Sequence, residues 1–141
     1  VAHGSLTVAV VVAVNAAGDI GDPATSTAVA DGVFRGWPES GDLFTAPPVA
    51  GAHARSRGNT TIGAVVTDAG LTKGECLLLA QSAHDGLARA VFPPHMRSDG
   101  DAFVAAATGT VPRGNGDGGA DLDVLRVLTV AAVEQAVVRA C

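Results

Sequence analysis

The sequence has only two cysteines among its 141 residues, Cys76 and the last residue, Cys141. Two cysteines give no set of paired spacings from which a disulfide framework could be inferred, so a reducing compartment is expected. The nine lysine and arginine residues are scattered along the chain, and the formal net charge is -5. Because no basic cluster is present to attract a phosphate backbone, nucleic acid is not an expected partner.

Long apolar runs are also missing. The longest, Val8 to Val14, is far shorter than the roughly 20 residues that cross a bilayer, and no basic segment precedes it. We therefore expect a cytoplasmic protein without a membrane partner. The four histidines are dispersed and form no ligand pattern of the HExxH or CxxC kind, so no metal site is expected.

The composition itself is that of a globular domain. Apolar residues make up 48% of the chain and charged residues 16%, which is enough apolar surface for one hydrophobic core. The chain begins at Val1 without an initiator methionine and ends on a predicted helix. We therefore expect residues 1–141 to be a single domain and the C-terminal part of a larger precursor.

Local patterns predict three strands and two helices, which is an α+β fold with helices packed on a sheet. Leu6 to Val14 is nearly continuous in apolar, β-branched residues, which predicts a strand buried on both faces. Thr72-Lys73-Gly74-Glu75 is a capping box that starts a helix running to about Val91. The remaining predicted elements are strands over Thr61–Thr67 and Ala102–Thr108, a helix over Asp121–Ala140, a long loop over Ala16–Gly58 and a turn over Gly109–Gly119.

A threonine pair, Thr60-Thr61, follows the polar segment Arg57-Gly58-Asn59 at the start of the second predicted strand. Threonine is a poor nucleophile until a base takes its proton, and an N-terminal threonine carries that base as its own α-amine. β-Branching restricts χ1 and would hold the hydroxyl in one direction. From spacing alone, the simpler interpretation is that both threonines are ordinary first residues of a strand. The residues by themselves do not show which of the two would be the nucleophile.

Asp99 and Asp101 lie just before the third predicted strand. In extended backbone, residues i and i+2 point to the same face, so both carboxylates can be aimed at one site. Asn15 ends the first predicted strand, where its amide N–H could stabilise a developing oxyanion. The alternatives are a solvated turn for the two aspartates and a turn former at Asn15.

The glycine pattern of Gly114–Gly119 formally matches a dinucleotide-binding fingerprint, since it separates a predicted strand from a helix. We reject this interpretation, because Asp117, Asp121 and Asp123 would repel a pyrophosphate at the start of that helix. The same acidic residues lack the spacing of an EF-hand, so calcium is not expected either.

Several blocks of the sequence together resemble the self-processing peptidases that include the aminopeptidase/D-esterases, the β-peptidyl aminopeptidases and the 6-aminohexanoate-oligomer (nylon oligomer) hydrolases. The blocks are VAVVVAVNAAGD around Asn15, GNTTIGAVVTDAGLT around Thr60, LAQSAHDGLARAVFPPH in the first predicted helix and SDGDAFVAAATG around Asp99 and Asp101. The resemblance implies an αββα sandwich similar to that of N-terminal nucleophile hydrolases. It also implies that the precursor cuts itself between Asn59 and Thr60.

The resemblance also implies roles for individual residues. Thr60, the new N-terminus of a β chain over residues 60–141, would be the nucleophile. Asn15, on the α chain that ends at residue 59, would help bind the oxyanion. Asp99 and Asp101 would orient the amine of the nucleophile and shuttle protons.

The resemblance implies an aminopeptidase or an amide-oligomer hydrolase that acts on small peptides or oligomers, needs no cofactor and forms a homo-oligomer, a tetramer by likeness. The DGD motif and a threonine nucleophile are closer to the nylon-oligomer branch than to the β-peptide branch. Members of the family carry a large N-terminal portion that these 141 residues lack. The alternative interpretation is therefore a catalytically inactive structural or interaction domain of the same fold.

Overall fold

The computed structural model describes residues 1–16, 18–21, 59–96, 99–112 and 118–141. Within these residues, four strands form one mixed sheet in the order β1-β2-β4-β6. Its members are β1 (Ala2–His3), β2 (Leu6–Ala13), β4 (Ile62–Ala69) and β6 (Ala102–Val111). β2 is antiparallel to β1 and β4, whereas β4 and β6 are parallel. The expected α+β class is confirmed.

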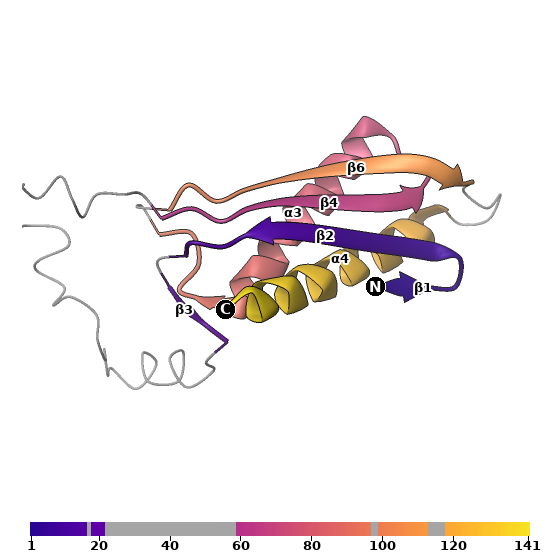
Figure 1. Cartoon of the computed structure of the whole chain (residues 1–141). Coiled ribbons are helices and arrows are strands. Elements are labelled where there is room, and N and C mark those ends of the chain that lie inside the picture. The colour runs from indigo at the N-terminus through magenta and orange to yellow at the C-terminus, as the bar shows by residue number, and fades with distance from the viewer. Residues whose placement is uncertain (17, 22–58, 97–98, 113–117) are drawn as a thin grey trace, which may run out of the picture.

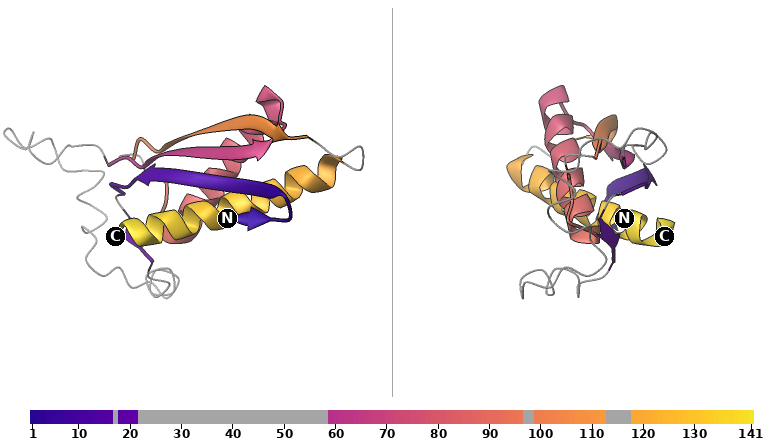
Figure 2. Two further views of the ribbon diagram at one scale, coloured as in Figure 1. Left: turned by 45° about the vertical axis from the view of Figure 1, so that its right-hand side comes forward. Right: turned by 90° about the vertical axis from the view of Figure 1, so that its left-hand side faces the viewer.

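Helix α3 (Lys73–Ala90) joins the two parallel strands, and helix α4 (Gly118–Ala140) follows β6. Both helices lie on the same side of the sheet, α4 along β2 and α3 beneath β6 (Figures 1 and 2). A helical crossover of this kind is what a parallel strand pair requires. Within the described residues, no helix is long and apolar enough to cross a membrane.

The capping box predicted for α3 is present. The hydroxyl of Thr72 accepts a hydrogen bond from the backbone N–H of Glu75, and the carboxylate of Glu75 accepts one from the N–H of Thr72. Each bond satisfies an amide that the first helical turn leaves without a partner. The helix ends at Ala90, and Val91 begins the short strand β5 (Val91–Phe92), which pairs with β3 (Asp19–Ile20).

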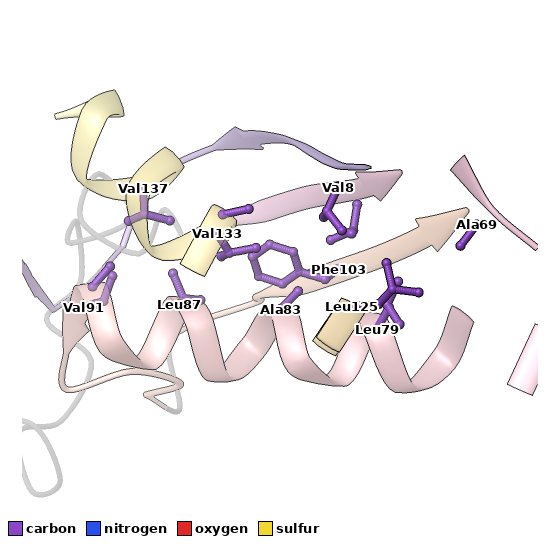
Figure 3. Close-up of a cluster of buried hydrophobic side chains, with 13 residues drawn as sticks. Val8, Ala69, Leu79, Ala83, Leu87, Val91, Phe103, Leu125, Val133 and Val137 are labelled. Atoms are coloured by element: carbon purple, nitrogen blue, oxygen red, sulfur yellow. The ribbon is translucent and has the colours of Figure 1, made fainter. Parts of the chain in front are cut away.

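The hydrophobic core lies between the sheet and the two helices (Figure 3). Strand residues of one parity point into it, among them Val8, Val65 and Phe103, none of which is more than 9% exposed. The helices contribute fully or almost fully buried leucines, alanines and valines: Leu79, Ala83, Leu87, Leu125, Val133 and Val137. On helix α4, Leu125, Val133 and Val137 face this core, whereas Val127 and Val138 are exposed.

Strand residues of the other parity point to the opposite side, and the nine of them nearest the Asn15 end form what we call the open face of the sheet. The paired positions form three rows, each made of one residue from β2, β4 and β6. All nine residues are apolar, and eight are exposed and one half-buried: Ala13, Ile62, Ala102, Val11, Ala64, Val104, Ala9, Val66 and Ala106. The prediction that the first strand is buried on both faces is wrong for the described residues, because both helices pack against the opposite face.

The boundaries of the C-terminal elements also differ from the prediction. Strand β6 runs to Val111, so the turn expected from Gly109 starts later, and Gly109 is accommodated in the strand at a φ of +71°. Helix α4 begins at Gly118 rather than Asp121. Residues 22–58, which make up most of the predicted loop with its three aromatic residues, and residues 113–117 of the glycine pattern lie outside the described residues.

Candidate active site

Three segments that are distant in sequence meet at the end of the sheet where β2 finishes and β4 and β6 begin, the left end in Figure 1. The backbone N–H of Thr60 donates to the carbonyl of Asn15 at 2.8 Å, which continues the β2–β4 ladder. Asn59 forms a parallel bridge with Asp99, which continues the β4–β6 register. The structure therefore brings together the residues that the sequence blocks singled out.

Because residues i and i+2 of a strand share a face, Asn15, Thr60 and Gly100 form a fourth row beyond the three apolar rows. The side chain of Thr60 lies beside position 100, since a Cβ built on Gly100 would sit 2.9 Å from the Oγ of Thr60. The nucleophile candidate is thus on the open-face side of its strand. Thr60 is half-buried and Asn15 is exposed.

The peptide bond between Asn59 and Thr60 has polar partners in place. The hydroxyl of Thr60 donates to the carbonyl oxygen of Asn59 at 2.6 Å, so Oγ lies against the carbonyl that precedes it. The backbone N–H of Gly100 donates to the same oxygen at 2.8 Å. A donor at this position can stabilise negative charge that develops on the oxygen when the carbonyl carbon is attacked.

On the opposite side of the strand lie Thr61 and Asp101. Thr61 is completely buried, and its N–H donates to Oδ1 of Asp101 at 2.7 Å. The other carboxylate oxygen, Oδ2, lies 2.9 Å from Nδ1 of His95, and the side chain of Asp101 is only 5% exposed. Asp101 therefore holds the amide that directly follows the Thr60 carbonyl.

Asp99 contacts the loop that precedes it. Its Oδ2 accepts from the N–H of Met96 at 2.7 Å, and its own N–H donates to the carbonyl of Met96 at 2.8 Å. These two reciprocal bonds close the loop just before β6. The two aspartates thus accept hydrogen bonds of 2.7 Å from different backbone amides: Asp101 from Thr61 and Asp99 from Met96.

Two imidazole rings lie near Asp101: that of His95 contacts it directly, and that of His84 contacts His95. The ring of His84, on α3, lies 5.0 Å from the ring of His95 and makes an edge-on contact with Phe103 at the same centroid distance. Burial, followed by the nearby charge of His95, lowers the pKa of His84, while Asp101 and Asp85 oppose the shift. His84 is therefore held in its neutral form at neutral pH.

Two contributors to this site were missed by sequence reasoning. His95 was set aside because the histidines form no ligand pattern, yet it contacts Asp101 from a backbone φ of +54°. Gly100 is not singled out by the sequence patterns, although a Cβ at this position would lie 2.9 Å from the Oγ of Thr60. A glycine in DGD at the start of a strand is the signal that could have identified it. No group of three or more potential metal ligands occurs among the described residues.

Comparison with known proteins identifies the family. The sequence pattern that defines peptidase family S58 matches residues 1–141 of this chain. The chain belongs to peptidase family S58. Relatives include proteins of Mycobacterium tuberculosis and Mycobacterium bovis, each named an uncharacterized aminopeptidase and each 38% identical over 122 residues, which is 75% of this chain and 33% of the relative. An uncharacterized aminopeptidase of Mycobacterium leprae is 41% identical over 117 residues, covering 74% and 30%.

The S58 chain spans about a third of the length of these curated relatives. The family match confirms the resemblance drawn from the sequence blocks.

Proposed function

We propose that this S58 chain carries the cleavage site and the nucleophile of a self-processing amide hydrolase, with Thr60 as the nucleophile. The observation that carries the proposal is the arrangement around one carbonyl: the Asn59 oxygen accepts from the Thr60 hydroxyl at 2.6 Å and from the Gly100 N–H at 2.8 Å. Family membership and the names of the relatives support a hydrolase that acts on peptide bonds. The full protein would act as an aminopeptidase or on short amide oligomers.

Self-cleavage would start with attack of Thr60 Oγ on the carbonyl carbon of Asn59. The Gly100 N–H would stabilise the resulting oxyanion, which is the role that such donors have in acyl transfer. The C–N bond then breaks, the hydroxyl proton is transferred to the departing Thr60 nitrogen, and an ester joins Asn59 to Thr60 Oγ. Water hydrolyses this ester and leaves a carboxylate on Asn59 and a free amine on Thr60.

In the mature enzyme the same Oγ would attack a substrate amide. The free amine of Thr60 would act first as general base and then as general acid toward the leaving amine. The carbonyl of Asn15, 2.8 Å from the Thr60 nitrogen, would keep that amine in place. Asn15 shares the row of Thr60, which supports the role in binding the substrate oxyanion that the resemblance implies.

The open face supports the αββα sandwich implied by the resemblance. Nine apolar residues form a continuous exposed surface on three strands, with Val11 at 75% and Val104 at 65% exposure. An uncovered apolar surface of this kind is costly in water and marks a packing or interaction surface. A second sheet from the remaining two thirds of an S58 protein would cover it and place Thr60 at the rim between the two sheets.

Intact mass and N-terminal sequencing of the full-length protein test the proposal. A fragment whose sequence begins Thr-Thr-Ile is expected, and within these residues the two products are 59 and 82 residues long (141 - 59 = 82). Thr60→Val should leave the chain uncut, because it removes Oγ while keeping the β-branched shape.

The neighbouring threonine provides a matched control. The Oγ of Thr61 is buried without a hydrogen-bond partner among the described residues, so Thr61→Val removes nothing that is bonded there. This variant should still be cut before Thr60. An uncut wild-type chain would reject the mechanism and favour the inactive structural domain, and a cut Thr60→Val chain would reject Thr60 as the nucleophile.

A further inference from the structure

We propose that His95 is a positioning residue for the reaction at Thr60. It acts through Asp101 and the Thr60–Thr61 peptide, and the proposal rests on the function proposed above. The contacts are continuous: Nδ1 of His95 lies 2.9 Å from Oδ2 of Asp101, and Oδ1 of Asp101 accepts from the N–H of Thr61 at 2.7 Å.

Burial explains why Asp101 needs both partners. Its side chain is 5% exposed, and a buried carboxylate is costly unless its oxygens accept hydrogen bonds. Thr61 satisfies one oxygen and His95 satisfies the other. When the Asp101 carboxylate is ionised its oxygens only accept, so Nδ1 of His95 is then the donor of this contact.

The loop and the helix hold the imidazole of His95 in place. Met96, the next residue, is bonded in both directions to Asp99, at 2.7 and 2.8 Å. His95, which directly precedes Met96, adopts a φ of +54°, a left-handed conformation that side-chain-bearing residues rarely adopt. The ring of His84 lies against that of His95 on the helix side. A strained residue that is fixed in this way is a common feature of functional sites.

His95 is not placed to exchange a proton with Thr60 Oγ. Asp101 and Thr61 lie on the helix-covered side of the strands, whereas Thr60 projects beside Gly100 on the other side. What His95 can do is fix the orientation of the peptide that follows Thr60. That peptide sets the backbone angle ψ of Thr60, and since χ1 of a β-branched residue is restricted, it also sets the direction of Oγ.

Substitutions of His95 in the full-length protein test this assignment. The side-chain nitrogen of asparagine is as many bonds from Cβ as Nδ1 of histidine is. The nitrogen of glutamine is one bond further out, and alanine has no donor at all. Self-cleavage is followed by intact mass during cell-free synthesis. We expect His95→Ala and His95→Gln to slow cleavage roughly 10- to 100-fold, as a small misplacement of reacting groups does, and His95→Asn to restore most of the rate.

Controls separate positioning from loss of fold and from failure of the proposed function. His3, exposed in β1, provides a matched variant, and His3→Ala should be cut at the wild-type rate. Equal rates for wild type and His95→Ala, or no rescue by His95→Asn compared with His95→Gln, would overturn the role of His95 while leaving the function standing. A wild-type protein that is not cut before Thr60 would overturn both proposals.

Discussion

On its helix-covered face the sheet presents Val8, Val65 and Phe103, each at most 9% exposed. On its open face the same strands present Val11, 75% exposed, and Val104, 65% exposed. The two faces have similar apolar residues, and they differ in what lies against them. Alternating apolar and polar residues would have indicated a face that is meant for water. A strand that is apolar on both faces, and that the described residues cover on only one, supports the second layer proposed above.

The same alternation separates the parts of the candidate site. Thr60 and Gly100 lie on the side of the open face, next to the carbonyl of Asn59. Asp101 lies on the helix-covered side with its side chain 5% exposed, and His95, 40% exposed, contacts it from the preceding segment. In the proposed mechanism, the reacting hydroxyl is thus on the open-face side, and the buried carboxylate of Asp101 is on the other.

Gly100→Ala is expected to have the largest effect on the open side. The new Cβ would lie 2.9 Å from Thr60 Oγ, so the hydroxyl must rotate away from the Asn59 carbonyl. Self-cleavage, measured by intact mass, should slow by about 100-fold. Gly100 is exposed and outside the left-handed region of φ, so the urea midpoint should hardly change. Cleavage at the wild-type rate would show that Oγ need not contact that carbonyl.

Val65 and Val66 offer the most direct comparison of the two faces, because they are adjacent valines on β4 that are 0% and 40% exposed. Val65→Ala should lower the free energy of unfolding by about 2 kcal/mol, from lost burial and the cavity left behind. If a second sheet covers the open face, Val66→Ala in the full-length protein should cost nearly as much. Urea unfolding measures both, and a cost for Val66→Ala below about 0.5 kcal/mol, typical of surface positions, would argue against that sheet.

Two glycines of helix α3 test how tightly the covered side is packed. A Cβ on Gly86 would lie 2.6 Å from the carbonyl oxygen of Val130 and 2.8 Å from the Cβ of Val133, both on α4, whereas one on Gly74 would meet nothing within 4 Å. Gly86→Ala should therefore destabilise the fold by about 1–3 kcal/mol despite its better helix propensity. Gly74→Ala should stabilise it by about 0.5 kcal/mol. Thermal unfolding would show shifts of opposite sign, and two shifts of the same sign would contradict this packing.

Most of the fold could be predicted from the sequence where the signal is local. The β-branched run from Leu6 and the capping box at Thr72 each specify an element through neighbours within a few residues, and both elements formed as predicted. The two-sided burial of the first strand was predicted wrongly, because periodicity reports apolar character and not what covers it. The pairing of β3 with β5 joins residues about 70 positions apart, for which a local pattern holds no information.

The candidate site shows the same division between local and distant signals. Asn15, Thr60 and the two aspartates were singled out by motif resemblance, and the structure brings these segments to one end of the sheet. The role proposed for His95 depends on its contact with a carboxylate six residues later. No spacing rule connects an isolated histidine with such a contact.

The smallest expected effect concerns His84 on the covered side. Its pKa in the folded protein is lowered from 6.5, mainly by burial and then by His95. Below pH 6.5 the unfolded chain therefore binds more protons at this residue than the folded chain does, and stability falls as the pH falls. The contribution of neutral His84 to the free energy of unfolding is fully present above pH 6.5. It is lost as the pH drops through the lower pKa of His84 in the folded state.

Urea midpoints measured across this pH range should decline less steeply for His84→Asn than for wild type, whereas His3→Asn should follow the wild-type curve. The effect should be small because most of the His84 ring environment is still screened by solvent. Parallel curves for His84→Asn and wild type would mean that His84 is protonated as readily in the fold as in the unfolded chain. The helix-covered side would then be better hydrated around Asp101 than its 5% side-chain exposure indicates.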